Sequence, residues 1–203
     1  LNPPQMHWRS GYTSNQNSED NKAAYVLYND VVDDKVFTVN STANIAIKDN
    51  FLIDFGLMYK RLNSKNYAKI DDLLGADFHN DIDPFSDTLN DVNGNAAKNE
   101  NDIFNYNYTL NASNFKGFGQ VRVQYPKWDA AATAEVETFN YQRNGAFKNE
   151  RFLDASQDKS KSVNFSNINL KSSFTYKITG RHLVTAQGAL LNKAPVLQNV
   201  FIN

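Results

Sequence analysis

The stretch VFTVNSTANIAIKDNFLIDFGLMYK, residues 36–60, decides the fold class of this chain. Apolar or small residues alternate with polar ones on both sides of the turn-like segment Lys48-Asp49-Asn50. Successive residues of a β-strand point to opposite faces, so this alternation predicts two strands, each with one apolar and one polar face. The apolar face would consist of Phe37, Val39, Ser41, Ala43, Ile45 and Ile47 before the turn and Phe51, Ile53, Phe55, Leu57 and Tyr59 after it.

The same pattern occurs twice more, in residues 114–141 and 164–192. The second hairpin is expected to turn at Pro126-Lys127-Trp128-Asp129 and the third at Thr179-Gly180-Arg181. Residues that pair directly across an antiparallel hairpin share a face, so the turn length fixes which faces meet. These turns pair Tyr125 with Ala130 and Ile178 with His182. Both pairings keep the apolar face continuous from one strand to the next, which supports about six up-and-down strands.

A sheet with one apolar and one polar face fits either a soluble β-sandwich or a transmembrane β-barrel. The ends at 48–50, 126–129 and 179–181 are short, whereas the segments at the opposite ends are long. Outer-membrane barrels have short periplasmic turns and longer extracellular loops, and a sandwich has no reason to place every long loop at one end. The loop lengths therefore favour the barrel, and a soluble secreted β-sandwich that acts as a binding or adhesion module is the alternative.

Composition is compatible with both structures. The chain has 203 residues, a formal net charge of −1 and no cysteine, and its mean hydropathy is −0.58. A near-neutral chain has no overall attraction to nucleic acid, and the lack of cysteine excludes disulfides and thiolate metal sites. No stretch approaches the ~18 apolar residues of a membrane-spanning helix.

The alternating and irregular stretches predict seven consecutive segments in one partial barrel wall, residues 1–203. They are an extracellular loop (1–34), hairpin 1 (35–62), a long extracellular loop (63–113), hairpin 2 (114–141), an extracellular loop (142–163), hairpin 3 (164–192) and the start of an extracellular loop (193–203).

Several short segments, in order along residues 20–203, resemble the barrel of TonB-dependent receptors from Bacteroidota. They are Ala24-Tyr25-Val26-Leu27-Tyr28-Asn29-Asp30, Asp33-Asp34, Asn40-Ser41-Thr42, Asp71-Asp72-Leu73-Leu74-Gly75, Asp81-Ile82-Asp83-Pro84-Phe85, Asn140-Tyr141-Gln142-Arg143-Asn144-Gly145, Thr175-Tyr176-Lys177-Ile178-Thr179-Gly180-Arg181 and Ala194-Pro195 with Phe201.

The resemblance implies a location in the bacterial outer membrane and an internal part of a barrel of about 22 strands, whose lumen holds a plug domain. It implies uptake of a nutrient (an iron chelate, an oligosaccharide or a peptide) by active transport rather than enzymatic activity. The implied partners are outer-membrane lipid, the TonB protein through the plug and its TonB box, and a surface lipoprotein. About six strands cannot close around a plug, and no plug or TonB box is recognisable, so we expect the chain to be a fragment of a larger receptor.

Candidate chemical sites are few, and we predict no catalytic, cofactor-binding or metal-binding residues. The acidic loop offers oxygen atoms that suit Ca²⁺, but the distal glutamate of a calcium loop is missing, so a solvated loop is favoured. His7, His79 and His182 lack metal-ligand spacing. Glu135 and Glu137 share a face, where Arg122 across the hairpin would keep them ionised. The aspartates of the acidic loop are Asp71, Asp72, Asp77, Asp81, Asp83, Asp87 and Asp91.

Overall fold

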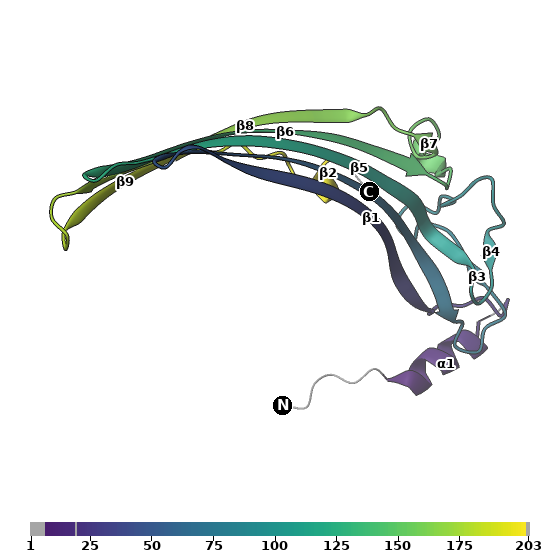
Figure 1. The fold of residues 1–203 in the computed structure, drawn as a ribbon. Helices are drawn as coiled ribbons and strands as arrows, with labels where there is room; N and C mark the ends of the chain where they lie inside the picture. The colour runs from purple at the N-terminus through teal and green to yellow at the C-terminus, as the bar shows by residue number, and fades with distance from the viewer. Residues whose placement is uncertain (1–6, 19, 202–203) are drawn as a thin grey trace. The chain divides into compact units, whose positions relative to one another are not determined.

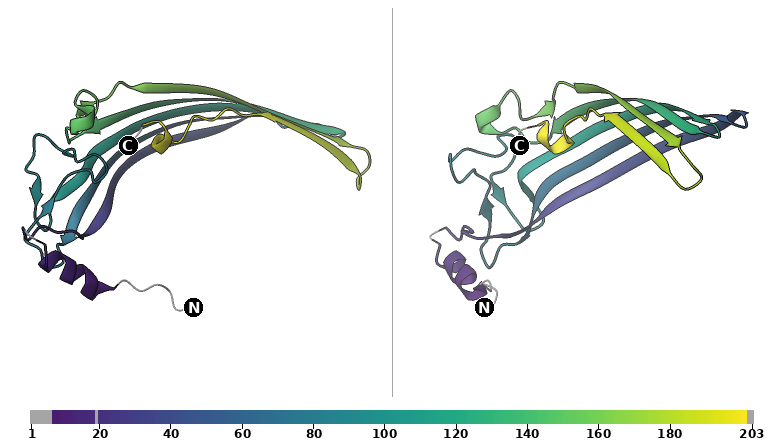
Figure 2. Two further views of the ribbon diagram at one scale, coloured as in Figure 1. Left: turned by 180° about the vertical axis from the view of Figure 1, so that it is seen from behind. Right: turned by 90° about the vertical axis from the view of Figure 1, so that its left-hand side faces the viewer.

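The computed structural model describes residues 7–18 and 20–201 and consists mainly of antiparallel β-strands connected up and down (Figure 1). The main sheet has the strand order β1-β2-β5-β6-β8-β9, with the short strand β7 paired to β6. In the right-hand view of Figure 2, β1 in purple, β2 in blue and β5 in teal run side by side in this order. The expected antiparallel, up-and-down β class is confirmed.

The elements are α1 (Trp8–Gln16), β1 (Leu27–Lys48), β2 (Phe51–Asp72), β3 (His79–Asn80), β4 (Ala97–Lys98), β5 (Ile103–Gln124), β6 (Trp128–Gly145), η1 (Glu150–Phe152), β7 (Asp158–Lys159), β8 (Val163–Lys177), β9 (Leu183–Leu190) and η2 (Leu197–Asn199). These elements belong to two compact units. Unit 1 consists of Leu1–Lys35, Asn63–Leu110 and Gln142–Lys161, and unit 2 of Val36–Leu62, Asn111–Tyr141 and Ser162–Asn203.

The register of unit 2 places the predicted apolar residues on one face. Ala130 lies opposite Phe174 and Val136 opposite Ile168 across β6 and β8. Lys177 lies opposite Leu183 across β8 and β9. The Ile178 N–H donates to the carbonyl of His182 at 2.9 Å. The predicted pairing at the third turn is therefore confirmed.

The second turn is tighter than predicted, and the pairing of Tyr125 with Ala130 is wrong. The Tyr125 N–H donates to the Trp128 carbonyl at 2.8 Å, and β6 begins at Trp128. Pro126 fixes a φ angle that suits the first central position of a tight turn. The Trp128 ring lies 4.7 Å from the Tyr125 ring and 6.0 Å from the Phe174 ring, and these contacts hold Trp128 within the sheet.

The strands extend well beyond the alternating stretches, which corrects the predicted segment boundaries. β1 begins at Leu27, inside the segment 1–34 that was expected to be irregular. β2 and β5 together reduce the predicted loop 63–113 to residues 73–102. β6 continues to Gly145, inside the predicted loop 142–163. These extensions carry polar residues on both faces, so they lack the alternation that identifies a half-buried strand.

Unit 1 has a small apolar core beneath the long connection. Its buried side chains belong to Ala23, Ala68, Ile70, Leu73 and Phe104. α1 is attached through Asn15, which is fully buried and bonds backbone groups near residues 24 and 73. Gly75 has a φ of +80° directly after Leu74, which has a φ of +50°. Glycine adopts this left-handed conformation without steric cost, so it suits the turn that follows β2.

The segment after β9 lies along unit 2. The Asn192 N–H donates to Oδ1 of Asn169 at 2.7 Å, and Nδ2 of Asn192 donates to the Ile168 carbonyl at 2.9 Å. The Tyr141 hydroxyl donates to the Pro195 carbonyl at 3.4 Å. Asn192 is therefore held against β8, and Pro195 at the start of the predicted loop 193–203 is held against β6. Residues 202 and 203 lie outside the described part of the chain.

Candidate functional site

The polar face of unit 2 contains a row of ion pairs. Lys116 Nζ lies 2.8 Å from Glu135 Oε2, and Arg122 Nε lies 2.8 Å from Asp54 Oδ2. These pairs join β5 to a neighbouring strand on each side, because β2 and β6 flank β5. In addition, Nζ of Lys177 on β8 lies 2.7 Å from Oδ1 of Asp129 on β6. Opposite charges paired across adjacent strands satisfy each other's hydrogen-bonding groups on a partly buried surface.

The predicted partnership of Arg122 with Glu135 and Glu137 is wrong. Glu135 instead accepts from Lys116 and from the Asn169 amide at 2.9 Å. Glu137 accepts from the Asn114 amide at 3.0 Å. The tight second turn explains this difference, because it shifts β6 along β5 and brings Glu135 toward Lys116.

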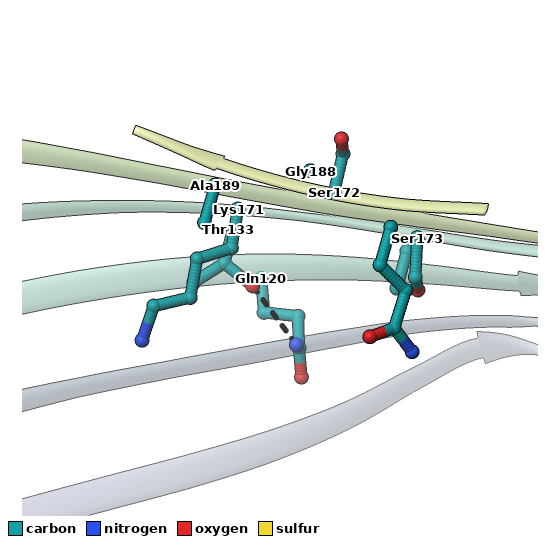
Figure 3. A pocket seen from close by; sticks show the side chains of 9 residues that line it. Gln120, Thr133, Lys171, Ser172, Ser173, Gly188 and Ala189 are labelled. Carbon is teal, nitrogen blue, oxygen red and sulfur yellow. Dashed lines mark hydrogen bonds between the residues drawn. The ribbon is translucent and has the colours of Figure 1, made fainter. Parts of the chain in front are cut away.

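Hollows on this polar face lie beside Lys171. The first has a volume of about 380 Å³ and is lined by side chains that include Gln120, Thr133, Lys171 and Ser173. Figure 3 shows Lys171 and Gln120 on one side of the sheet and Ser172 on the other, with the Gln120 amide bonded to the Thr133 hydroxyl at 2.9 Å. Hydroxyl, amide and ammonium groups in one hollow provide hydrogen bonds for a polar ligand.

The second hollow, of about 470 Å³, shares Lys171 with the first. Its lining also includes Lys116, Glu135, Glu137 and Lys193, with Phe139 as an apolar surface. Sequence analysis left the ligand-binding residues unknown. Lys171 was indistinguishable from other polar strand residues, because only the assembled sheet reveals which polar groups line a common hollow.

The opposite face of unit 2 exposes large apolar side chains. Phe174 is 47% exposed, Ile168 58% and Val184 59%. Similar exposure is found for Phe37, Val39, Ile45, Ile47, Phe55, Leu57, Val136, Leu170, Tyr176 and Leu190. Contiguous exposed apolar surface of this kind marks an interaction with protein or membrane rather than with water.

The aspartates of the acidic loop mainly hold turns together. Asp72 accepts from the Leu74 N–H at 2.7 Å, and Asp91 accepts from the Asn93 N–H at 3.1 Å. Asp83 accepts from the Phe85 N–H at 2.8 Å, and this bond lowers the pKa of Asp83, with a further contribution from Arg151. In residues 7–18 and 20–201, no three His, Asp or Glu side chains are grouped in a way that would hold a metal ion.

The three histidines lie in different surroundings. His7 is exposed directly before α1, and Nδ1 of His182 lies 3.0 Å from the Thr179 hydroxyl at the third turn. The His79 ring packs edge-on against Phe104, with ring centroids 5.2 Å apart. Two side-chain atoms here are buried without a hydrogen-bond partner: Nδ1 of His79 and Oδ2 of Asp81. Asp81 as a whole residue is only 2% exposed.

We expect the stability of unit 1 to fall as the pH drops from about 7 to about 5. Burial lowers the pKa of His79 below its ordinary value of 6.5, against a smaller opposing influence from Asp81. The folded state therefore favours the neutral His79 ring. The contribution of this ring to the folding stability is complete above the pKa that His79 has in the unfolded state, and it is lost as the pH falls through the lower pKa of the folded state. Urea unfolding between pH 7 and pH 5 measures this loss of stability. Most carboxylates titrate below this range, so they contribute little to the change.

The variant His79→Gln provides the control for this pH dependence, because it keeps a polar side chain that does not titrate. Its unfolding free energy should change less between pH 7 and pH 5 than that of the unsubstituted chain. An identical pH dependence in both proteins would assign the effect to other groups.

Within the described residues, no helix has the length and apolar character needed to cross a membrane. Comparison of the chain with protein-family models, with curated proteins and with solved structures gives no match.

Proposed function

We propose that this chain forms part of the wall of a transmembrane β-barrel in the bacterial outer membrane, and that the barrel belongs to a TonB-dependent receptor importing a nutrient. The observation that carries the proposal is the contrast between the two faces of unit 2. One face exposes apolar side chains such as Leu170 and Phe174, and the other holds ion pairs such as Lys116 with Glu135. Lipid outside and water inside a barrel require this contrast.

The aromatic side chains near the second turn support the same orientation. The rings of Tyr125, Trp128 and Phe174 lie in contact beside the second turn, and those of Trp128 and Phe174 are stacked. Tyr176 lies opposite Trp128 across β6 and β8. Aromatic residues concentrate where a membrane protein crosses from hydrocarbon to headgroups. In the proposed wall this group lies at the periplasmic interface, next to the short turns.

The edges of the sheet support a larger wall. Among the described strands, β1 pairs only with β2, and β9 only with β8. An unpaired strand edge within a membrane leaves backbone groups without hydrogen bonds, so further strands have to continue the wall on both sides. A barrel of about 22 strands, as the sequence resemblance implies, would provide them and leave room for a plug domain.

The proposed transport role follows from this placement. The hollows around Lys171 would face the lumen, where a polar nutrient passes. TonB would act through the plug domain, and a surface lipoprotein is a candidate partner for the connections at the opposite end. The resemblance to TonB-dependent receptors supports these partners, and an iron chelate, an oligosaccharide and a peptide are the candidate nutrients.

Membrane fractionation and heat-dependent migration test the proposal. We expect the full natural protein to fractionate with outer membranes, to need detergent for extraction, and to migrate differently on a gel before and after boiling. A soluble β-sandwich would stay in solution as a monomer without detergent, because its apolar faces would pack together. Recovery of the natural protein in the soluble fraction would overturn the membrane assignment.

A further inference from the structure

The hollow of about 470 Å³ on unit 2 contains charged side chains that have no ion-pair partner. Lys116 and Glu135 line this hollow and neutralise each other at a distance of 2.8 Å. Lys171, Lys193 and Glu137 also line it. Among the described residues, no ion pair includes any of these three. The hollow therefore offers two cations and one carboxylate to a ligand.

The segment after β9 contributes one side of this hollow and is fixed to the sheet. Leu191 and Lys193 of this segment are among the lining residues. Between them, the Asn192 N–H donates to Oδ1 of Asn169 at 2.7 Å, and Nδ2 of Asn192 donates to the Ile168 carbonyl at 2.9 Å. These bonds position the backbone of Lys193 beside β8 before a ligand arrives, and a preorganised site loses less entropy on binding.

Apolar side chains face the same hollow. Phe139 on β6 lines it together with Leu191. The Phe139 ring is half-buried, and its centre lies 5.7 Å from the centre of the Tyr141 ring. A small-molecule site typically has a volume of about 300–1,000 Å³ and combines apolar walls with a few polar groups. The hollow has both properties.

The charged groups are separated along the strands. Across β6 and β8, Glu137 lies opposite Asn167, and Lys171 lies opposite Thr133. Glu137 and Lys171 are therefore at levels four residues apart, which is ~13 Å along a strand. Figure 3 shows the Lys171 side chain extending from the polar side of the sheet. An extended peptide of roughly three or four residues spans ~10–14 Å, so this separation suits the two charged ends of a short peptide.

The charges also distinguish among the candidate nutrients. A neutral oligosaccharide would displace water from Glu137 and Lys171 without supplying an opposite charge to either, and this desolvation is unfavourable. An anionic iron chelate would be attracted by Lys171 but repelled by Glu137. A ligand that carries both an ammonium and a carboxylate group satisfies the two side chains with charge-assisted hydrogen bonds.

We propose that this hollow binds a short peptide with free termini. The peptide ammonium pairs with Glu137, its carboxylate pairs with Lys171 with Lys193 nearby, and an apolar side chain of the peptide packs against Phe139. This inference rests on the proposed transport function and names the substrate class of that function.

Equilibrium dialysis of the full natural protein, extracted in detergent, tests the proposal with the labelled tripeptide Ala-Phe-Ala. Acetylation of its amine or amidation of its carboxylate should each weaken binding about 10-fold, because each removes one charge-assisted hydrogen bond. Lys171→Gln should weaken binding of the free peptide about 10-fold but leave the affinity for the amidated peptide unchanged. Glu137→Gln should do the same with respect to the acetylated peptide. Two changes that remove the same contact are not additive, so this pattern assigns each terminus to its residue.

The matched controls are Lys127→Gln and Asp49→Asn, which remove the same charges from exposed turns of unit 2. Both should bind the three peptides as the unsubstituted protein does. Absence of Ala-Phe-Ala binding, tighter binding of the neutral sugar maltotriose, or weakening by amidation alone would refute the peptide site while the membrane location stands. Recovery of the natural protein in the soluble fraction would overturn the proposed function whatever the peptide affinities are.

Discussion

Substitution of Asn15 by aspartate is expected to destabilise unit 1 by at least about 3 kcal/mol. The Asn15 amide is fully buried, and its nitrogen donates to the carbonyls of Tyr25 and Leu73, both at 2.8 Å. Its oxygen accepts from the N–H groups of Ala24 at 2.8 Å and Tyr25 at 3.0 Å. Aspartate would place an oxygen against the two carbonyls, losing both donated bonds and burying a negative charge.

The pH dependence of this variant provides a second observable. Burial against carbonyl oxygens would raise the pKa of the new carboxyl group, because only the protonated form can donate to a carbonyl. The folded state would bind the proton more tightly than the unfolded state. The loss of stability caused by Asn15→Asp should therefore be smaller at acidic pH than at neutral pH.

Urea unfolding and amide hydrogen exchange of unit 1 measure this loss of stability. Asn17→Asp provides the control, since Asn17 is exposed directly after α1 and its substitution should change stability by no more than about 0.5 kcal/mol. Equal stability of the two variants would show that the buried amide does not hold α1 to the unit.

Replacement of Leu170 by arginine should destabilise the protein in lipid vesicles by about 2–4 kcal/mol. Leu170 lies opposite Ala134 on the apolar face of unit 2 and is 46% exposed. In water, a side chain this exposed tolerates a charge at little cost. In the proposed wall the same position faces hydrocarbon, and an arginine that faces hydrocarbon near the middle of the membrane strongly lowers the folding stability.

Ser173→Arg on the same strand is the matched control, because residue 173 lines a hollow on the polar face. The unfolding free energies of both variants in vesicles give the comparison. The lipid-facing assignment requires Leu170→Arg to be the less stable of the two. If Ser173→Arg were equally destabilised, the apolar face of unit 2 would not be the lipid-facing one.

The strands of unit 2 could be predicted because their signal is local. Alternation between Ile168 and Leu170 on one side and Asn167 and Asn169 on the other is visible in consecutive residues. The third turn was also predictable, since three residues between Ile178 and His182 leave few ways to close a hairpin. The strand extensions were not predictable, because polar residues on both faces remove the alternation.

The ion pairs of the polar face required the tertiary structure. Glu135 was expected to meet Arg122, but the tight turn after Tyr125 shifts β6 along β5 and makes Lys116 its partner. Arg122 instead pairs with Asp54, which is 68 residues away in sequence. A shift of two residues keeps every side chain on its face while changing its neighbours, so alternation predicts the face but not the partner.

The sequence by itself determined that this chain forms up-and-down antiparallel strands with one apolar and one polar face. Successive side chains of a strand point to opposite faces, so the two faces can be identified from consecutive residues. Only the tertiary structure decided how Asn15 fixes α1, which polar groups line the hollows around Lys171, and which carboxylates Lys116 and Arg122 meet. These contacts join residues that are distant in sequence, and their geometry depends on strand register and turn length rather than on local pattern.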